Sequence, residues 1–335
     1  MRLSTALTLI PFMLVVALAL GLGIAGRLST HDAVQAHSSA PTRSEAVAPS
    51  PTATAAVPSP SETAASPSPS ASPTATASAA PTALSANDPS AMLRVHNDLR
   101  AAVGAPAVRA DDRVTAAAQK HAEYLARNDA LGHDETPGAP GFSGVFVRDR
   151  LVAQGYTDAT ASEVATSFSN GTDGVRSLWV LPYHRLGLMH PHAIVAGWGH
   201  AETAGRTITV GVIVYDFSVP APDRVRAPAP AQRVATTYSG EEVPEVLPPG
   251  ASRPVGYPIM AVFSNARAVD LRSARLTEAG GPDFAYHVVP QLYERDYVAI
   301  IPAAPLTPGA RYHVRLELTV AGADVVEEWD FETER

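Results

Sequence analysis

The sequence predicts an α+β protein, in which a domain of helices and strands is followed by an all-β domain. Between residues 88 and 181, apolar residues recur at the spacing of three and four that is typical of buried helix faces. From residue 194 to residue 217 the period changes to two. Beyond residue 240 only the period of two recurs, in short runs separated by Gly and Pro. The 335 residues are enough for both domains.

The N-terminal segment predicts export. Residues 6–24 are almost continuously apolar and lie between Arg2 and Arg27. Such a run is long enough to cross a bilayer core of about 30 Å, and its position also fits a secretory signal. Residues 1–26 are therefore expected to be a signal peptide or a signal anchor. If the segment is not cleaved, it makes the membrane a partner of the chain.

Residues 27–87 predict a disordered stalk. Almost every residue from Ser38 to Ala86 is Ala, Pro, Ser or Thr, and no aromatic residue occurs between Phe12 and Tyr124. A segment of this composition buries too little apolar surface to offset the entropy of ordering it. We therefore expect an extended spacer that holds the folded part away from the membrane.

The composition of the whole chain excludes several classes of site. The chain has no cysteine, which excludes disulfides, thiolate zinc sites and a cysteine nucleophile. Its formal net charge is −8, with no long basic run. This charge argues against nucleic acid as a partner.

Residues 88–217 are expected to form four helices followed by a β-hairpin. Asp88-Pro89 is typical of a helix start, with Asp as the N-cap and Pro in the first turn. The further helices are expected from about Asp112, over residues 144–154 and over residues 173–181. Residues 207–217 are apolar on both faces, so this strand is expected to be central, with helices on each side.

Five short motifs follow one another along this region. They are Ala117-Ala118-Gln119-Lys120-His121-Ala122, Leu131-Gly132-His133, Asp149-Arg150-Leu151 before Gly155-Tyr156, Ser162-Glu163-Val164, and Trp179 before Pro182-Tyr183-His184-Arg185. Their order and spacing resemble the bacterial branch of the CAP superfamily, the extracellular domain of sperm-coat and plant pathogenesis-related proteins. The resemblance implies a CAP-type α-β-α sandwich. It also implies a surface cleft in which two histidines and one or two glutamates meet.

The resemblance places His133, Glu163 and His184 in this ligand cleft. Two neutral imidazoles and a carboxylate are a sufficient ligand set for Zn²⁺ or another divalent cation, with a fourth position open to water. The alternative is a metal-free polar cluster in which Glu163 hydrogen-bonds a histidine. The chain has Val164 and Val195 where relatives often carry Asn and Glu, so three site residues are expected instead of four. No serine lies in a Gly-x-Ser-x-Gly elbow, and no catalytic residue is assigned.

Other polar and aromatic residues near these motifs have simpler interpretations. His121 lies among alanines and is expected to pack in the core. His190 and His192 flank Pro191 and are expected in a solvated loop, with metal recruitment as the alternative. Trp179 and Trp198 are expected to be core aromatics, with a place in the wall of the cleft as the alternative.

Residues 218–240 are expected to be a linker, and residues 241–335 an all-β sandwich. Six or seven short runs with a period of two, separated by Gly and Pro, are typical of such a domain. The run from Leu306 to Tyr312 resembles the tyrosine corner of immunoglobulin-like domains. The region therefore looks similar to bacterial Ig-like modules, which implies a role in spacing, presentation or adhesion.

Three functions remain open from the sequence. The favoured one is an exported, surface-tethered CAP-domain protein whose His/Glu cleft binds an apolar, glycan or peptide ligand without turnover, with or without a divalent metal. The expected partner is a cell-envelope component, such as a lipid or a glycan. The alternatives are a metal-assisted hydrolase of a peptide, ester or cell-wall substrate, and a structural or adhesive surface protein. Each implies an extracellular chain, either secreted or anchored to the membrane by its N-terminal segment.

Overall fold

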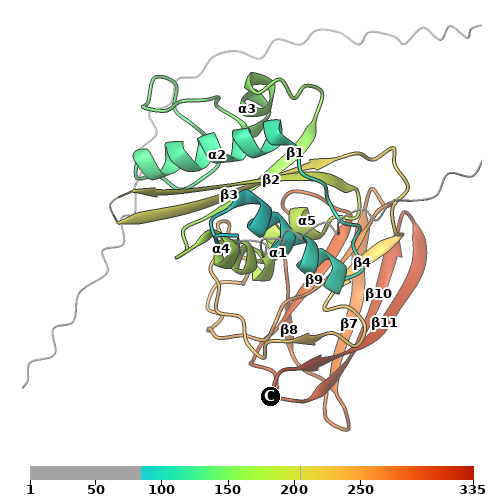
Figure 1. The fold of residues 1–335 in the computed structure, drawn as a ribbon. Helices are drawn as coiled ribbons and strands as arrows, with labels where there is room; N and C mark the ends of the chain where they lie inside the picture. The colour runs from blue at the N-terminus through green and yellow to red at the C-terminus, as the bar shows by residue number, and fades with distance from the viewer. Residues whose placement is uncertain (1–83, 204) are drawn as a thin grey trace, which may run out of the picture. The chain divides into compact units, whose positions relative to one another are not determined.

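The computed structural model describes residues 84–203 and 205–335, which belong to a single unit (Figure 1). The predicted signal segment, residues 1–26, and nearly all of the predicted stalk, residues 27–87, lie outside the described residues. Within the described part, none of the helices combines the length and the apolar character needed to span a membrane.

The first domain contains helices whose starts are encoded locally. The helices are α1 (Pro89–Ala102), α2 (Asp112–Arg127), α3 (Val147–Ala153), α4 (Gly171–Val180) and α5 (Pro182–Met189). The Asp88 side chain caps α1 by accepting a hydrogen bond from the Ser90 N–H at 2.7 Å. The predictions of helices from residues 88 and 112 are thus confirmed, whereas α3 is shorter than expected.

Helix α5 was not expected. Pro182 follows Leu181, the last residue of the predicted fourth helix, and a proline normally indicates a helix end. Here Pro182 occupies the first turn of a new helix, where its missing N–H removes no hydrogen bond. His184 therefore lies on a helix that packs beside α4.

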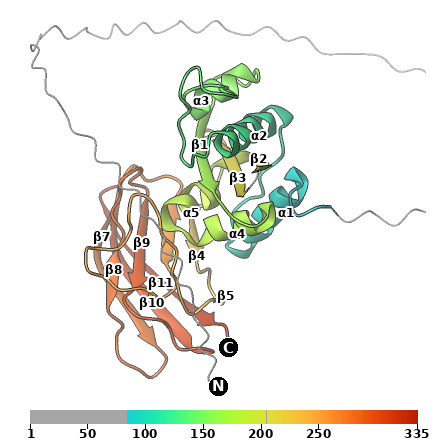
Figure 2. The ribbon, with the colours of Figure 1, turned by 90° about the vertical axis from the view of Figure 1, so that its left-hand side faces the viewer.

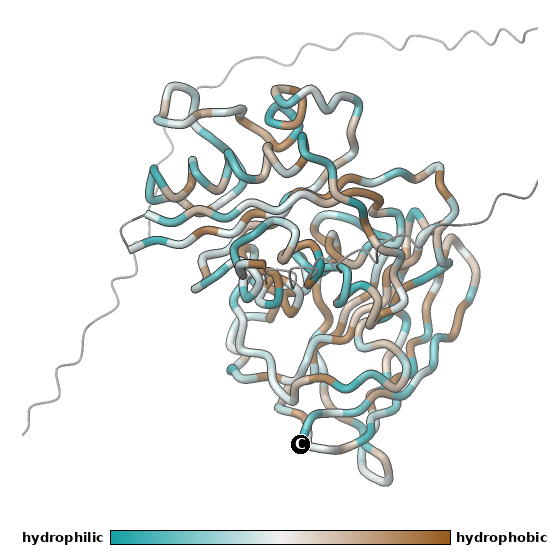
Figure 3. Tube along the Cα trace, in the orientation of Figure 1, coloured by the Kyte–Doolittle hydropathy of each residue, from teal (hydrophilic) through white to brown (hydrophobic). Residues whose placement is uncertain are grey.

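A three-stranded antiparallel sheet forms the middle layer of the first domain (Figure 1). Its strands are β1 (Thr160–Thr166), β2 (Ala193–Thr203) and β3 (Arg206–Tyr215), in the order β1-β3-β2. Strand β3 is central, as predicted, while β1 was not expected. Helices α2 and α3 cover one face of the sheet, and α1, α4 and α5 cover the other. Figure 3 shows hydrophobic residues along the strands between these layers, and hydrophilic residues on the outer turns of α2.

Alternation along β3 places its side chains in two different cores. Ile208, Val210, Val212 and Val214 join the core formed with α2. Ile213 joins the core on the opposite face, together with Trp179 and Trp198. The edges of the two tryptophans meet the buried His96 ring, which confirms both as core aromatics.

The C-terminal region consists of two four-stranded sheets, drawn in colours from yellow to red in Figure 2. The first contains β4 (Arg224–Ala227), β6 (Ile259–Phe263), β9 (Tyr297–Pro302) and β8 (Tyr286–Val288), in that order. The second contains β5 (Arg233–Val234), β11 (Ala323–Thr333), β10 (Arg311–Val320) and β7 (Val269–Glu278). Buried side chains of both sheets share one hydrophobic core. Since β4 and β5 fall within the expected linker 218–240, the strand-bearing region begins at Arg224 and not at residue 241.

Tyr312 makes the hydrogen bond expected of a tyrosine corner. Its hydroxyl accepts a hydrogen bond from the Thr307 N–H at 2.8 Å and donates to Glu278 Oε2 at 3.1 Å. This bond fixes the turn that enters β10. The assignment of the whole region to the Ig-like modules stays a prediction.

The segment from Tyr183 to His192 contacts the C-terminal sheets. Tyr183 donates its hydroxyl hydrogen to the Pro290 carbonyl at 3.0 Å, and Arg185 donates to the Pro258 carbonyl at 2.9 Å. His190 Nε2 lies 2.9 Å from Asp296 Oδ2, and His192 Nε2 lies 3.1 Å from the Ser264 carbonyl. Both histidines are buried, so the expectation of a solvated loop is wrong. The loop is instead enclosed by the following domain.

Candidate functional site

The structure brings His133 and Glu163 together but places His184 elsewhere. His133 Nδ1 lies 3.3 Å from Glu163 Oε1. His184 Nδ1 lies 2.6 Å from the carboxylate of Glu242, a residue that the sequence did not single out. The three predicted site residues therefore do not converge on one point.

The reason for this separation is the alternation of side chains along β1. Ser162 faces α5, because its Oγ lies 2.5 Å from the Tyr215 hydroxyl, which in turn donates to the Gly187 carbonyl. Glu163 is the next residue and points to the opposite face, toward α2 and α3. His184 lies on α5, so the sheet stands between its helix and the Glu163 carboxylate.

Glu163 belongs to a buried charged cluster. Arg150 donates from Nη2 to Glu163 Oε2 at 2.7 Å, and His121 Nε2 lies 3.3 Å from Glu163 Oε1. His121 Nδ1 lies 2.9 Å from Glu135 Oε1. The side chains of these four residues are at most 2 % exposed, whereas that of His133 is 53 % exposed. The His133 imidazole, which contacts Glu163, thus connects the buried cluster with the solvent. His121 is packed as expected, and it is also a member of this site.

Glu135 is a site residue that the sequence interpretation missed. Its carboxylate accepts hydrogen bonds from the Ser143 N–H at 2.5 Å and from the Ser143 hydroxyl at 2.9 Å. Its own N–H donates to the Val145 carbonyl at 3.0 Å. Glu135 therefore ties the segment after His133 to the segment before α3. The only local signal was an acidic residue two positions after His133.

Arg150, which is buried, also ties the segment at His133 to the segment before α3. Besides Glu163, its guanidinium donates to the backbone carbonyls of His133 at 2.9 Å and of Gly144 and Val145 at 3.1 Å. Hydrogen bonds of a charged donor to several acceptors are strong and directional. Arg150 thus neutralises Glu163 and fixes the backbone from which His133 projects.

The donor set does not fit the divalent metal that the resemblance implied. Across residues 84–203 and 205–335, no group of three or more His, Cys, Asp or Glu side chains is placed to hold a metal ion. The Arg150 guanidinium lies 2.7 Å from Glu163, and its positive charge opposes a dication at that carboxylate. His184, the second expected imidazole, pairs with Glu242.

Large apolar side chains are exposed on the segments that carry His133. Leu131 is 53 % exposed, Phe142 40 % and Phe146 57 %. They flank the stretches that Glu135 and Arg150 hold together. We call Leu131, His133, Phe142 and Phe146 the His133 surface.

Two pockets of the described part lie away from this surface. One, of about 480 Å³, is lined mainly by residues 155–160 and 214–217. The other, of about 590 Å³, lies between α4 and residues 237–241. Neither is lined by His133, Glu163 or His184, so the predicted ligand cleft coincides with neither pocket.

Glu242 caps α5 from a distant part of the chain. Its buried carboxylate accepts hydrogen bonds from the backbone N–H groups of Tyr183 at 3.2 Å and of His184 at 3.0 Å. These N–H groups belong to the first turn of α5, where the helix dipole favours negative charge. His184 therefore contacts the capping carboxylate of Glu242 with both its backbone N–H and its imidazole.

The replacement Glu242→Gln is expected to lower the free energy of unfolding by about 2 kcal/mol, because it removes charge from a buried cap and from the contact with His184. Urea denaturation of the full chain measures this change. The matched control is Glu241→Gln, which alters the exposed neighbour and is expected to change stability by less than about 0.5 kcal/mol. Equal effects of the two substitutions would contradict the capping role.

Comparisons with known proteins agree with part of the sequence interpretation. Residues 93–215, from α1 to the end of β3, match the CAP family model, described as the cysteine-rich secretory protein family. The prediction of a CAP domain in this region is therefore confirmed. A search of curated proteins found no match.

Several solved structures are similar to parts of the chain. An extracellular protein containing a SCP domain, from Bacillus anthracis, has 17 % identity and a TM-score of 0.33, with 38 % of this chain and 40 % of that chain covered. An outer surface protein from Borrelia burgdorferi has 16 % identity and a TM-score of 0.33, with 38 % and 90 % covered. CopC from Methylosinus trichosporium has 13 % identity and a TM-score of 0.23, with 32 % and 88 % covered. The present chain thus spans less than half of the first of these proteins.

Proposed function

We propose that this chain, with its CAP domain at residues 93–215, is an exported, surface-tethered binding protein. Its ligand is a cell-envelope lipid, held at the His133 surface without turnover. Export and tethering rest on the predicted signal segment, residues 1–26, and on the predicted stalk, residues 27–87. The chain is accordingly extracellular, either secreted or anchored to the membrane by its N-terminal segment.

The observation that carries this proposal is a half-exposed imidazole fixed by a buried carboxylate. Among the described residues, Glu163 is the only side chain that hydrogen-bonds the His133 ring, and it uses Nδ1. The other ring nitrogen is left to bind a ligand. Since Arg150 holds both the Glu163 carboxylate and the His133 carbonyl, the imidazole is positioned before the ligand arrives. Such preorganisation lowers the entropic cost of binding.

The exposed apolar side chains indicate the chemistry of the ligand. Leu131, Phe142 and Phe146 lie on the same segments as His133 or on segments tied to them, and they expose apolar area that water solvates poorly. A lipid offers an acyl chain to this area and a polar headgroup to the imidazole. Covering the exposed half of one phenylalanine contributes on the order of 1 kcal/mol.

Binding is favoured over hydrolysis because the site exposes one positioned imidazole, that of His133, and the described residues offer it no hydroxyl partner for catalysis. A histidine base needs a hydroxyl or thiol nucleophile, or a substrate water, within hydrogen-bond reach. Among the described residues, no hydroxyl group hydrogen-bonds His133. Glu163 is already neutralised by Arg150, so it does not supply a free carboxylate for a metal.

The proposal is tested with lauroyl lysophosphatidylglycerol, below its critical micelle concentration, by titration calorimetry on the full chain. We expect His133→Ala to raise the Kd about tenfold, because the headgroup loses a hydrogen bond worth roughly 1.4 kcal/mol. Phe146→Ala is expected to raise it by a similar factor through lost apolar contact.

The matched control is Phe168→Ala, since Phe168 is 46 % exposed but lies beside the pocket at α4. It is expected to leave the Kd unchanged. Absence of binding by the wild-type chain would overturn the proposal. So would a Kd that all three substitutions change equally.

A further inference from the structure

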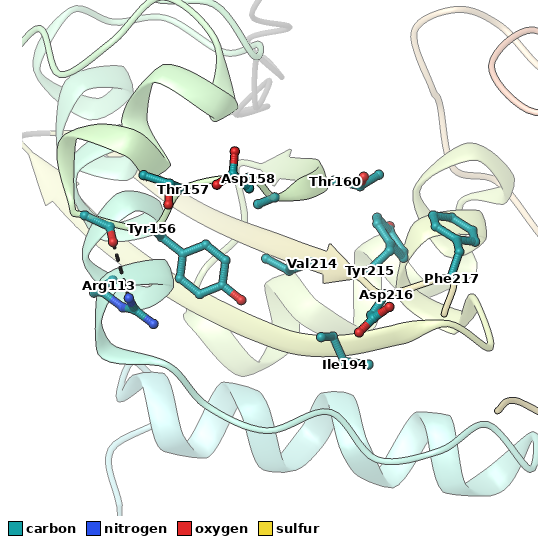
Figure 4. Close-up of a pocket in the computed structure, with 12 residues that line it drawn as sticks. Arg113, Tyr156, Thr157, Asp158, Thr160, Ile194, Val214, Tyr215, Asp216 and Phe217 are labelled. Atoms are coloured by element: carbon teal, nitrogen blue, oxygen red, sulfur yellow. Dashed lines mark hydrogen bonds between the residues drawn. The ribbon is translucent and has the colours of Figure 1, made fainter. Parts of the chain in front are cut away.

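The pocket of about 480 Å³ lies at one end of the central sheet (Figure 4). Its walls come from the loop between α3 and β1, from the end of β3 and from the first residue of β1, Thr160. Arg113 of α2 and Ile194 of β2 complete it. We call it the strand-end pocket. It contains no residue of the His133 surface, so its role does not depend on the function proposed above.

One wall of the strand-end pocket is the exposed aromatic ring of Phe217, which contacts the rings of two other residues. Phe217 is 57 % exposed. The centre of its ring lies 5.1 Å from that of His192 and 6.1 Å from that of Tyr215. Because His192 is buried and its Nε2 contacts the Ser264 carbonyl, one of the rings that Phe217 packs on is held in place. A rigid aromatic face of this kind binds a flat ligand at low entropic cost.

A second aromatic ring is held in place at the other end of the pocket. The Arg113 guanidinium lies 4.6 Å from the centre of the Tyr156 ring, and its Nη1 donates to the Gly155 carbonyl at 3.3 Å. Figure 4 shows the Tyr156 side chain extending across the pocket between Arg113 and Asp216. The tyrosine hydroxyl thus adds a polar group to a lining that also contains Thr157, Asp158 and Asp216.

The charges of the strand-end pocket exclude anions. Arg113 is its one cationic lining residue, and Asp111 already neutralises it through hydrogen bonds of 2.8 and 3.0 Å. Asp158 and Asp216 also line the pocket. Hydrogen bonds from Ser218 hold the pKa of Asp216 below its usual value, so this carboxylate is ionised at neutral pH. The remaining charge is therefore negative.

We infer that the strand-end pocket binds a neutral pyranose saccharide of one or two rings. A pyranose carries hydroxyl groups around its edge and C–H groups on its faces. The hydroxyls donate to the carboxylates of Asp158 and Asp216, while a C–H face packs on the negative face of the Phe217 ring. The volume lies within the range of about 300–1,000 Å³ that is usual for small-ligand sites. A uronic acid is rejected by the two aspartates.

The test uses four neutral disaccharides: maltose, cellobiose, lactose and N,N′-diacetylchitobiose. Saturation-transfer NMR and titration on the full chain measure binding, with any detergent chosen without a sugar headgroup. At least one disaccharide is expected to bind. Phe217→Ala is expected to raise its Kd at least tenfold, and Asp216→Asn about fivefold. Asp216→Asn keeps the shape of the side chain, so it separates loss of the site from loss of the fold.

Two controls complete the experiment. Phe168→Ala removes an aromatic side chain of comparable exposure outside the pocket, and it is expected to leave the Kd unchanged. Digalacturonic acid is expected to bind at least tenfold more weakly than the best neutral disaccharide. The inference is overturned if none of the four disaccharides binds. It is also overturned if Phe217→Ala and Asp216→Asn leave the Kd unchanged, or if the acidic disaccharide binds equally well.

Discussion

The replacement Gly199→Ala is expected to lower the free energy of unfolding by about 3 kcal/mol, because it forces a methyl group into the backbone of a helix. A Cβ at this position of β2 would lie 2.5 Å from the carbonyl carbon of Ala118, and closer still to the backbone of Gln119. Backbone atoms in the middle of a helix cannot relieve such a contact by changing rotamer, as a side chain can. Helix α2 must therefore move away from the sheet, or β2 must bend.

Such a movement also breaks specific hydrogen bonds. The Gln119 side chain donates to the His200 carbonyl and accepts from the His200 N–H, both at 3.0 Å. It further loosens the core in which α2 packs on β3. The same close approach occurs at Gly197, where a Cβ would lie 2.6 Å from the Val114 carbonyl oxygen. The two glycines are thus the reason that α2 can lie directly on β2.

Urea denaturation compares Gly199→Ala with Gly281→Ala. A Cβ at Gly281 would meet its nearest neighbour, Glu278 Cβ, at 3.4 Å, which is ordinary van der Waals contact. We expect this control to change the free energy of unfolding by less than about 1 kcal/mol. If Gly199→Ala were as mild as the control, the packing of α2 on β2 would have to be less close than described.

Acid is expected to destabilise the chain through His96. This histidine is completely buried in α1, with Nε2 2.9 Å from the Leu188 carbonyl. Burial, reinforced by the nearby Arg100 guanidinium, lowers its pKa from 6.5 to about 3. The folded chain therefore keeps His96 neutral at a pH at which the unfolded chain protonates it.

The sign of the effect follows from proton binding. Below pH 6.5 the unfolded state binds a proton that the folded state does not, so stability falls as the pH falls toward 3. Each pH unit across this window costs about 1.4 kcal/mol, and the whole window up to roughly 5 kcal/mol. Above pH 6.5 this contribution to stability is complete.

The measurement is the free energy of unfolding of His96→Gln and wild type at a series of pH values from 7 to 4. Glutamine has no titratable ring, so its curve is expected to be flatter than that of wild type by about 1 kcal/mol per pH unit. The control His287→Gln removes a histidine from the short strand β8 and should preserve the wild-type slope. Parallel curves for His96→Gln and wild type would rule out His96 as the source of acid sensitivity.

The parts of the fold that the sequence predicted are those with local signals. The start of α1 depends on neighbouring residues, since Asp88 caps the Ser90 N–H and Pro89 is the first residue of the helix. The two apolar faces of β3 predict its place in the middle of a sheet. Strand β1 has no such signal, since it contains few large apolar residues and its burial depends on pairing with β3. Helix α5 was missed because Pro182 ends one helix and begins the next.

The candidate site, too, was predicted only where short sequence motifs indicated its residues. The family motifs selected His133 and Glu163, which the structure places in contact. They also selected His184, whose partner is Glu242, 58 residues further along the chain. No short pattern records which face of a sheet a side chain occupies when the strand itself is not recognised. Glu135 and Arg150 contribute charge to the site for reasons that only the folded arrangement of the loop reveals.

The cap that Glu242 provides to α5 has a consequence for the order of events during synthesis. When the last residue of the CAP match, residue 215, leaves the ribosome, the carboxylate that completes α5 has yet to be made. The partners of Arg185 and His192, Pro258 and Ser264, follow later still. Until these residues are made, the first turn of α5 lacks the carboxylate that caps it, and Arg185 and His192 lack these partners.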